Sequence, residues 1–199
     1  MAEIRYIADP HFGHSNIITF DKRPFDSVES MDAELIDRWN SVVRNGDTTY
    51  IIGDFCWLKP ERWIEILKKL RGNKVLIRGN HDFPRFGPNL KKYFTDIKDY
   101  KCIRDRGRKV IMSHFPMLFY AGSYDPNTYM LCGHVHTTAE NVYLDKWRRE
   151  MADDRERSGG YGVSQAHVFN VGCMLPYMNY TPRTLDEIIE GVKDYDGRN

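Results

Sequence analysis

Residues 74–82 read KVLIRGNHD, a short apolar run that leads directly into a polar cluster. The run from Lys74 to Ile77 is typical of a buried strand. The glycine after it permits a tight turn and a close approach of the backbone. The cluster of Asn80, His81 and Asp82 is therefore predicted to lie at the end of a strand.

The same pattern recurs at four other places along the chain. Runs of apolar or β-branched residues precede polar clusters, as Ile4–Ala8 precedes Asp9-Pro10-His11, Thr48–Ile52 precedes Gly53-Asp54, Val110–Ser113 precedes His114, and Tyr129–Cys132 precedes Gly133-His134-Val135-His136. In open α/β sheets, the carboxyl ends of the strands form the edge where ligands bind. The sequence therefore predicts that these polar side chains converge at one edge.

Helical patterns separate the strands and indicate an α/β fold. The predicted helices are Ser30–Arg44, Pro60–Leu70 and Thr184–Val192, and His167–Val171 is one further predicted strand. Tyr100–Ile103 and Arg108–Met112 are expected to pair as a hairpin, so some antiparallel pairing should occur. Residues 141–160 form a charge-rich excursion, interpreted as a solvated helix or mobile segment. No linker divides the chain, so residues 1–199 are expected to form a single domain.

Composition excludes several classes of protein. The 199 residues carry a formal net charge of +1, which argues against general coating of nucleic acids. No apolar run approaches the roughly 20 residues that a membrane span needs, and the N-terminus lacks a signal-peptide pattern. We therefore expect no membrane association and a cytoplasmic location. The isolated cysteines are predicted to be reduced thiols in the core, namely Cys56, Cys102, Cys132 and Cys173.

The residue types in the polar clusters indicate a metal centre. Carboxylate, imidazole and amide donors suit Mn, Fe, Zn or Ni, and the candidate ligands are Asp9, His11, Asp54, Asn80, His114, His134 and His136. Because these are too many for one zinc ion, we expect two ions that share a carboxylate, with Asp54 as the natural bridge. Two ions about 3.5 to 4 Å apart can hold a hydroxide and clamp both oxygens of an in-line displacement at phosphorus. The pattern therefore predicts phosphoryl-transfer chemistry.

Taken in order, the motifs Asp9-x-His11, Gly53-Asp54, Gly79-Asn80-His81-Asp82, His114 and Gly133-His134-x-His136 resemble the signature of the calcineurin-like metallophosphoesterase superfamily. Further short segments, Phe12-Gly13-His14, Ile77-Arg78, Phe115-Pro116 and Asn170-Val171-Gly172, resemble small bacterial and phage members. The resemblance implies a four-layer α/β sandwich in which two packed mixed β-sheets are flanked by helices.

The resemblance also implies a division of the ligands between two divalent ions. Asp9, His11, Asp54 and His136 would bind the first ion, and Asp54, Asn80, His114 and His134 the second. Manganese is the expected ion, with Fe, Zn and Ni as alternatives.

His81 is expected to lie beside the ions as the general acid. A leaving alkoxide needs a proton, and imidazole titrates in a suitable range. Asp82 would then orient His81, although a turn carboxylate is the alternative interpretation. Pro10 is expected to favour an extended Asp9.

Four residues are candidates for contact with substrate, namely His14, Asn16, Arg23 and Tyr120. His14 could line the substrate pocket or support His11. Arg23 offers a planar fork to phosphate oxygens. Tyr120 could stack on a nucleobase or pack in the core.

The predicted reaction is hydrolysis of phosphodiesters of nucleotide size, with small phosphomonoesters as the second choice. A non-catalytic interaction module that keeps the fold is the alternative from another class, and the intact ligand set argues against it. A nuclease is a third possibility, against which the near-neutral charge weighs. The metal, the natural substrate and the oligomeric state are left open by the sequence.

Overall fold

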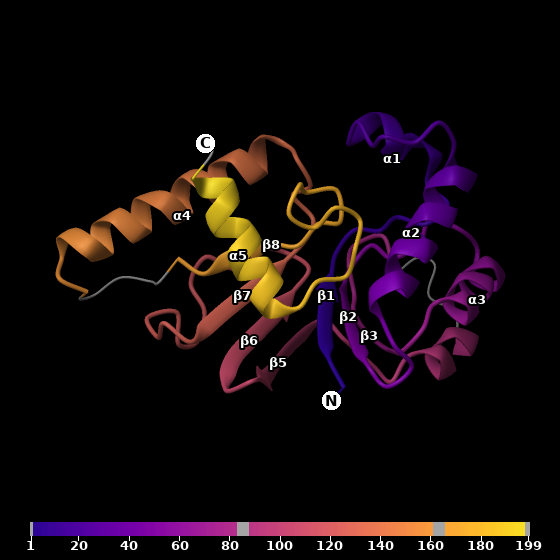
Figure 1. The fold of residues 1–199 in the computed structure, drawn as a ribbon, viewed down its shortest axis with the longest axis horizontal. Helices are drawn as coiled ribbons and strands as arrows, with labels where there is room; N and C mark the ends of the chain where they lie inside the picture. The colour runs from indigo at the N-terminus through magenta and orange to yellow at the C-terminus, as the bar shows by residue number, and fades with distance from the viewer. Residues whose placement is uncertain (1, 83–87, 161–165, 198–199) are drawn as a thin grey trace.

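The computed structural model describes residues 2–82, 88–160 and 166–197. Its strands form two four-stranded sheets (Figure 1). The first sheet has the order β1 (Ile4–Ile7), β2 (Thr48–Ile52), β3 (Asn73–Ile77) and β4 (Asp96–Lys98), with every pair parallel. The second has the order β5 (Tyr100–Asp105), β6 (Arg108–Ser113), β7 (Thr128–Cys132) and β8 (Val168–Asn170). Only β5 and β6 pair antiparallel in that sheet, as the predicted hairpin requires.

Helices lie on both sides of the paired sheets. In Figure 1, α1 (Ser15–Phe20), α2 (Val28–Val42) and α3 (Pro60–Lys69) lie beside the first sheet. On the side of the second sheet are α4 (Ala139–Arg157) and α5 (Leu185–Asp196). The 3-10 helix η2 (Pro88–Tyr93) precedes β4. The predicted α/β arrangement of two sheets flanked by helices is confirmed.

Local sequence explains where the long helices begin. Ser27 and Thr184 cap α2 and α5 through capping boxes with Ser30 and Glu187. Pro60 occupies the first turn of α3, where its missing N–H costs no hydrogen bond. These short-range signals are why the predicted helices agree with the observed ones to within a few residues.

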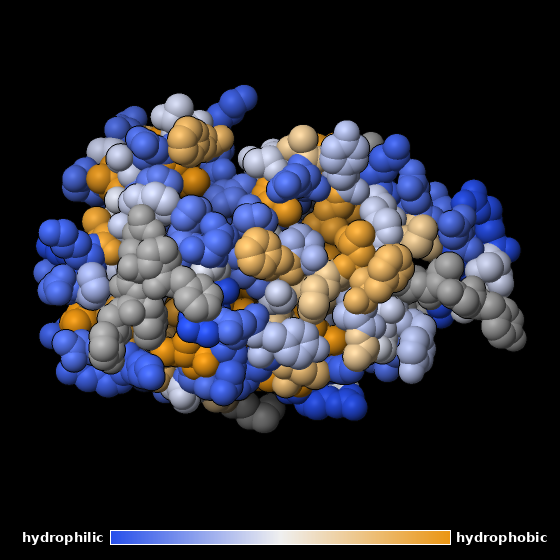
Figure 2. Space-filling view, turned by 180° about the vertical axis from the view of Figure 1, so that it is seen from behind, coloured by the Kyte–Doolittle hydropathy of each residue, from blue (hydrophilic) through white to orange (hydrophobic). Residues whose placement is uncertain are grey.

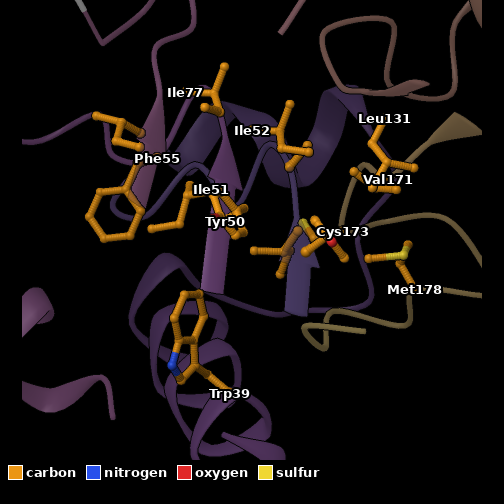
Figure 3. Packing of buried hydrophobic residues seen from close by; sticks show 14 of the residues in the cluster. Trp39, Tyr50, Ile51, Ile52, Phe55, Ile77, Leu131, Val171, Cys173 and Met178 are labelled. Atoms are coloured by element: carbon orange, nitrogen blue, oxygen red, sulfur yellow. The ribbon is translucent and has the colours of Figure 1, made fainter. Parts of the chain in front are cut away.

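Alternation along β6 and β7 divides the apolar interior into two parts. Val110, Met112 and Leu131 belong to the main core (Figure 3 shows part of it, Leu131 included), whereas Ile111 and Met130 face a second cluster with α4. Successive residues of a strand point to opposite faces of the sheet. The central parts of β6 and β7 are therefore buried on both faces, and this explains why these two strands read as continuous apolar runs.

Several expectations need correction or completion. The short elements α1, η2 and β4 had no predicted counterpart. Most of the charge-rich segment 141–160 lies in the regular helix α4, which begins after the capping residue Thr138 and ends at Arg157. Cys56, Cys132 and Cys173 are buried as expected, but Cys102 is exposed on β5. None of the helices that the structure describes is long and apolar enough to cross a bilayer.

Candidate metal centre

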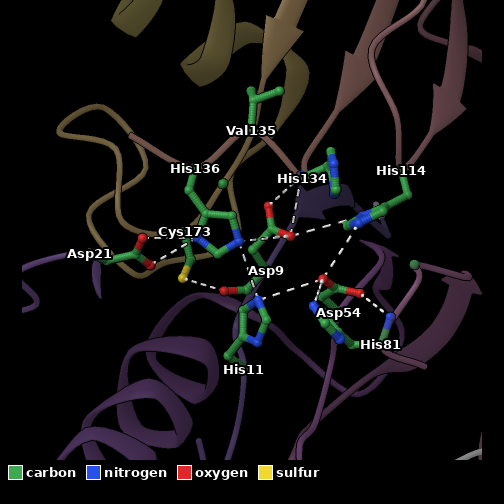
Figure 4. A network of polar contacts seen from close by, with 12 residues as sticks. Asp9, His11, Asp21, Asp54, His81, His114, His134, Val135, His136 and Cys173 are labelled. Atoms are coloured by element: carbon green, nitrogen blue, oxygen red, sulfur yellow. Dashed lines mark hydrogen bonds and ion pairs between the residues drawn. The ribbon is translucent and has the colours of Figure 1, made fainter. Parts of the chain in front are cut away.

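The polar clusters that follow the strands converge at one edge of the two sheets (Figure 4). Asp9, His11 and Asp54 come from the ends of β1 and β2, and His81 follows β3. His114, His134 and His136 follow β6 and β7 of the other sheet. The sequence led us to expect convergence at one sheet edge, and the structure shows that both sheets contribute to the site.

One group of donors consists of Asp9, His11, Asp54 and His136, whose ligand atoms all lie within 4.8 Å of one another. The Nε2 atoms of His11 and His136 are 3.3 Å apart. His11 Nε2 lies 3.7 Å from Asp54 Oδ2, and His136 Nε2 lies 3.8 Å from Asp9 Oδ1. Lone pairs that face a common point in this way fit a divalent cation.

A second group lies on the other side of the Asp54 carboxylate. Asn80 Oδ1 is 3.0 Å from His114 Nε2 and 3.1 Å from His134 Nδ1. Asp54 Oδ2 is 3.5 Å from His114 Nε2. The same carboxylate oxygen thus lies beside a histidine of each group, as expected of a bridging residue.

Hydrogen bonds outside the two groups set the histidine tautomers. His114 Nδ1 lies 3.0 Å from the Ile52 carbonyl oxygen, which can only accept, so Nδ1 carries a proton and Nε2 is the nitrogen that faces Asn80 and Asp54. His136 Nδ1 is held at 2.9 and 3.0 Å by the two carboxylate oxygens of Asp21. Such partners orient imidazole ligands and raise their basicity.

Arg23 lies underneath the site and does not face outward toward a substrate. It is 4% exposed, and its guanidinium donates to the main-chain oxygens of Asp9 and Pro10 and to Asp21. The expectation that Arg23 binds substrate phosphate is therefore corrected, because the donors that such binding needs are already used within the protein. Arg23 instead holds Asp21 and the Asp9–His11 turn in place.

Asp82 also has a different role from the one expected. It is fully buried, with Oδ1 accepting from Phe55 N and Oδ2 from Asp54 N and Gly79 N at 2.8 to 2.9 Å. These bonds tie the turn after β3 to the turn after β2. Burial raises the pKa of Asp82 to about 7, against the opposing hydrogen bond from Gly79. The side chain serves the backbone turns, so the expected orientation of the His81 ring by Asp82 is corrected.

His81 lies at the open side of the site. Its side chain is 40% exposed, and Nε2 is 3.9 Å from Asp54 Oδ2. The Trp57 ring lies 4.5 Å from the His81 ring and stacks at 4.0 Å on His14. His14 is buried, with Nδ1 3.4 Å from His11 Nδ1. Of the two roles considered for His14, this geometry favours support of His11.

The other two candidates for substrate contact are Asn16 and Tyr120. Asn16 is exposed on α1. Tyr120 packs against the second apolar cluster and donates its hydroxyl proton to the His167 carbonyl oxygen. The packing role considered for Tyr120 therefore describes its position better than stacking on a substrate.

The backbone at the site adopts an uncommon conformation. A positive φ, between 45° and 70°, occurs at Asp9, His11, Asp54, His134 and His136. Non-glycine residues adopt this region rarely, at a cost of about 1–3 kcal/mol each when strained. Asp9 was expected to be extended before Pro10. Instead, hydrogen bonds from Arg23 and Cys173 to its carbonyl oxygen hold it at φ 55°.

Electrostatics of the donor groups also suit a cation. Burial raises the pKa of Asp9 and lowers that of His11 well below its usual value. Burial opposes ionisation of Asp54, but the hydrogen bond and charge of His114 lower the pKa of Asp54 overall. Burial likewise opposes protonation of His114, but Asp54 and Asp9 raise the pKa of His114 to about 9. A metal ion would take the place of the protons that balance these buried carboxylates.

Sequence reasoning did not assign a supporting role to three residues at the site. Asp21, Trp57 and Cys173 touch His136, His14 and the Asp9 carbonyl oxygen, respectively. Asp21 comes just after α1, a helix that the sequence pattern did not predict. No local spacing links these positions to the donor groups, because tertiary packing alone brings them together.

Comparison with known proteins agrees with the fold and the site. The model of the family described as calcineurin-like phosphoesterase matches residues 3–160. The chain therefore belongs to the calcineurin-like phosphoesterase family, and it is a metal-dependent hydrolase that acts on phosphoesters.

The chain is also similar to relatives of similar length. The uncharacterized protein MJ1445 of Methanocaldococcus jannaschii is 31% identical over 192 residues, covering 96% of this chain and 91% of the relative. The Gene 66 protein of Mycobacterium phage L5 is 27% identical over 191 residues, covering 77% of this chain and 92% of the relative. The crystal structure of AQ665 from Aquifex aeolicus, a protein of unknown function, matches with a TM-score of 0.69 and 25% identity, covering 96% of this chain and 99% of that one.

Proposed function

We propose that the protein hydrolyses phosphodiesters of nucleotide size at a centre of two divalent ions, with manganese as the expected metal. The observation that carries the proposal is the position of Asp54 Oδ2, 3.7 Å from His11 Nε2 and 3.5 Å from His114 Nε2. One carboxylate oxygen can thereby serve both donor groups. Asp9, His11, Asp54 and His136 would hold one ion, and Asp54, Asn80, His114 and His134 the other.

Bound ions would supply Lewis acidity toward the phosphoryl oxygens. The chain's own residues would position the ligands and move a proton. Asp21 and the Ile52 carbonyl oxygen keep His136 and His114 in the tautomers that ligation needs. Nε2 of the half-exposed His81 can donate a proton to the leaving-group oxygen, because a general acid must be reachable by substrate and close to the reacting centre.

Aromatic side chains at two places beside the site support a diester over a monoester. Trp57 lies next to the His81 ring, and Phe115, 49% exposed, lies 4.5 Å from the His134 ring. A diester has an organic group on each of two phosphate oxygens, and each group could contact one of these rings. A small monoester would use only one of them.

A paired assay tests substrate preference. With Mn added, bis-p-nitrophenyl phosphate should be hydrolysed with a higher kcat/KM than p-nitrophenyl phosphate. A clear preference for the monoester would support the phosphomonoesterase alternative. If the metal-loaded protein hydrolysed neither compound, nor any nucleotide or sugar phosphate in a broad panel, the interaction-module interpretation would replace the proposal.

Two variants distinguish the role of a metal ligand, Asp54, from that of the general acid, His81. Asp54→Asn should lose activity together with most of the bound metal, because one bridging oxygen serves both groups. His81→Ala should lose activity, by about 10²–10⁴-fold in kcat, and retain both ions. Elemental analysis of the purified variants provides the second measurement. Loss of both ions from His81→Ala would show that His81 is a ligand and not the acid.

A further inference from the structure

An apolar cavity of about 480 Å³ adjoins the candidate metal centre, and its wall includes His134. The other lining residues that matter here are Phe115, Leu118, Glu140, Tyr143 and Trp147. They come from the loop after β6 and from the first half of α4. Small-molecule pockets typically measure about 300–1,000 Å³. The cavity is therefore large enough for one organic group of a substrate whose phosphate lies at the donor groups.

The walls of this cavity are unusually apolar for a surface feature. Phe115 is 49%, Leu118 36% and Tyr143 71% exposed. Hydrophobic residues gather in the half of the molecule that carries α4 in the rear view (Figure 2). Exposed apolar side chains that cluster in this way commonly mark a binding site.

Among the described residues that line the cavity, Glu140 is the one with an acidic side chain. It lies in the first turn of α4. Its side chain is exposed, its charge acts on His134, and in the part of the chain that the structure describes its carboxylate makes no hydrogen bond or ion pair. A carboxylate can only accept hydrogen bonds. A ligand with a flat apolar body and N–H donors along one edge would match both the apolar walls and this acceptor.

We propose that this cavity binds the nucleobase of the substrate and favours bases that carry an amino group; the inference rests on the proposed function and specifies its substrate. The aromatic rings of Phe115, Tyr143 and Trp147 offer stacking surfaces for a planar base. Glu140 accepts from an exocyclic amino group such as N4 of cytosine. Uracil has an oxygen at that position, which a carboxylate repels.

Two other occupants fit the cavity less well. An alkyl chain would bury the apolar walls but would make no use of the acceptor that Glu140 offers. A second copy of the chain would cover the apolar walls but would make no use of the donor groups, which this open pocket adjoins through His134. The nucleobase is the occupant that uses the apolar walls, the carboxylate and the neighbouring site together.

The first test compares p-nitrophenyl esters of ethyl phosphate, cytidine 5′-phosphate and uridine 5′-phosphate in the presence of Mn. Because all three release p-nitrophenolate, differences in rate report on the second organic group. The cytidine ester should exceed the ethyl ester by about tenfold in kcat/KM, mostly through KM. It should also exceed the uridine ester.

Substitutions of residues that line the cavity test whether the preference for the cytidine ester arises there. Tyr143→Ala should bring the ratio of cytidine to ethyl ester close to one. Val142→Ala is the matched control, because Val142 is 62% exposed on the same helix but does not line the cavity. Glu140→Gln should reduce or reverse the preference for cytidine over uridine, because an amide can also donate a hydrogen bond to the uracil oxygen.

A binding measurement without metal gives an independent readout. Cytidine 5′-monophosphate titrated into the metal-free protein should bind more tightly than uridine 5′-monophosphate by calorimetry, and Tyr143→Ala should weaken binding. Equal hydrolysis of the ethyl and cytidine esters would overturn the inference but leave the proposed function intact. Absence of hydrolysis of all three esters by metal-loaded protein would instead count against the proposed function. The inference would also be overturned if sedimentation showed a dimer that the Tyr143→Ala substitution dissociates, and if the protein showed no preference between cytidine and uridine.

Discussion

Asp82 is fully buried, and its two oxygens accept hydrogen bonds from three main-chain nitrogens. In Asp82→Asn, one oxygen is replaced by an NH₂ group that cannot accept them. Each buried N–H left unpaired costs about 1–3 kcal/mol, so the free energy of unfolding in urea should fall by at least that amount. Asp37→Asn, at an exposed position of α2, is the control. Unchanged stability with lower activity would instead favour the orienting role toward His81.

Gly79 is required by the close approach of Asp54. A Cβ atom at Gly79 would lie 2.2 Å from Asp54 Oδ1 and 2.6 Å from the Asp54 nitrogen, and the main-chain atom cannot move aside cheaply. Gly79→Ala should therefore displace Asp54 and lose most of the bound metal and activity. Gly46→Ala is a matched control, because nothing lies within 4 Å of its added Cβ. Full metal content in purified Gly79→Ala would contradict this account of the turn.

At the scale of elements, Asp47 connects the start of β1 to the loop before β2. Its carboxylate is 2% exposed and accepts from Glu3 N and Arg44 N, both at 2.8 Å. Burial would raise the pKa of Asp47, but these two hydrogen bonds outweigh it and lower the pKa below its ordinary value.

This shift predicts a pH dependence of stability. A carboxylate with a lowered folded pKa contributes stability above its unfolded pKa of about 3.9, and the contribution is lost as pH falls through the folded value. Asp47→Asn should therefore destabilise the protein by about 1.5–3 kcal/mol at pH 7. The difference from the wild type, measured by urea denaturation, should shrink below about pH 4. A difference that stays constant down to pH 2 would argue against the assigned pKa shift.

Elements with strong local patterns could be predicted from the sequence. The bounds predicted for the strand Thr48–Ile52 coincide with those of β2, and the predicted start of the helix at Pro60 coincides with that of α3. By contrast, α1 and β4 have 6 and 3 residues. Such short segments carry too few apolar repeats to produce a period, and packing against neighbours stabilises them.

At the scale of the whole molecule, the candidate metal centre links the two sheets. Asp9, His11 and Asp54 follow strands of the first sheet, whereas His114 and His136 follow strands of the second. A bound metal ion would therefore stabilise the packing of the sheets as well as the site. A ligand that binds only the folded state raises the free energy of unfolding by about 2.7 kcal/mol when its free concentration is one hundred times its Kd.

Adding Mn to EDTA-treated protein should accordingly raise the midpoint of urea denaturation, and EDTA should reverse the change. Asp54→Asn should abolish most of the increase, because the bridging carboxylate is lost. Urea denaturation of both proteins with and without Mn measures the effect. An equal increase in the wild type and in Asp54→Asn would mean that the metal binds elsewhere.

The sequence by itself determined the α/β class and the strand-end positions of the donors, because hydrophobic periodicity and turn residues are local properties. It also indicated the donor chemistry, since Asp, His and Asn recur directly after the apolar runs. Only the tertiary structure decided the roles of Arg23, Asp82 and Asp21, because their partners lie on other segments of the chain. It also decided the positive φ of Asp9, where contacts from Arg23 and Cys173 override the local preference imposed by Pro10.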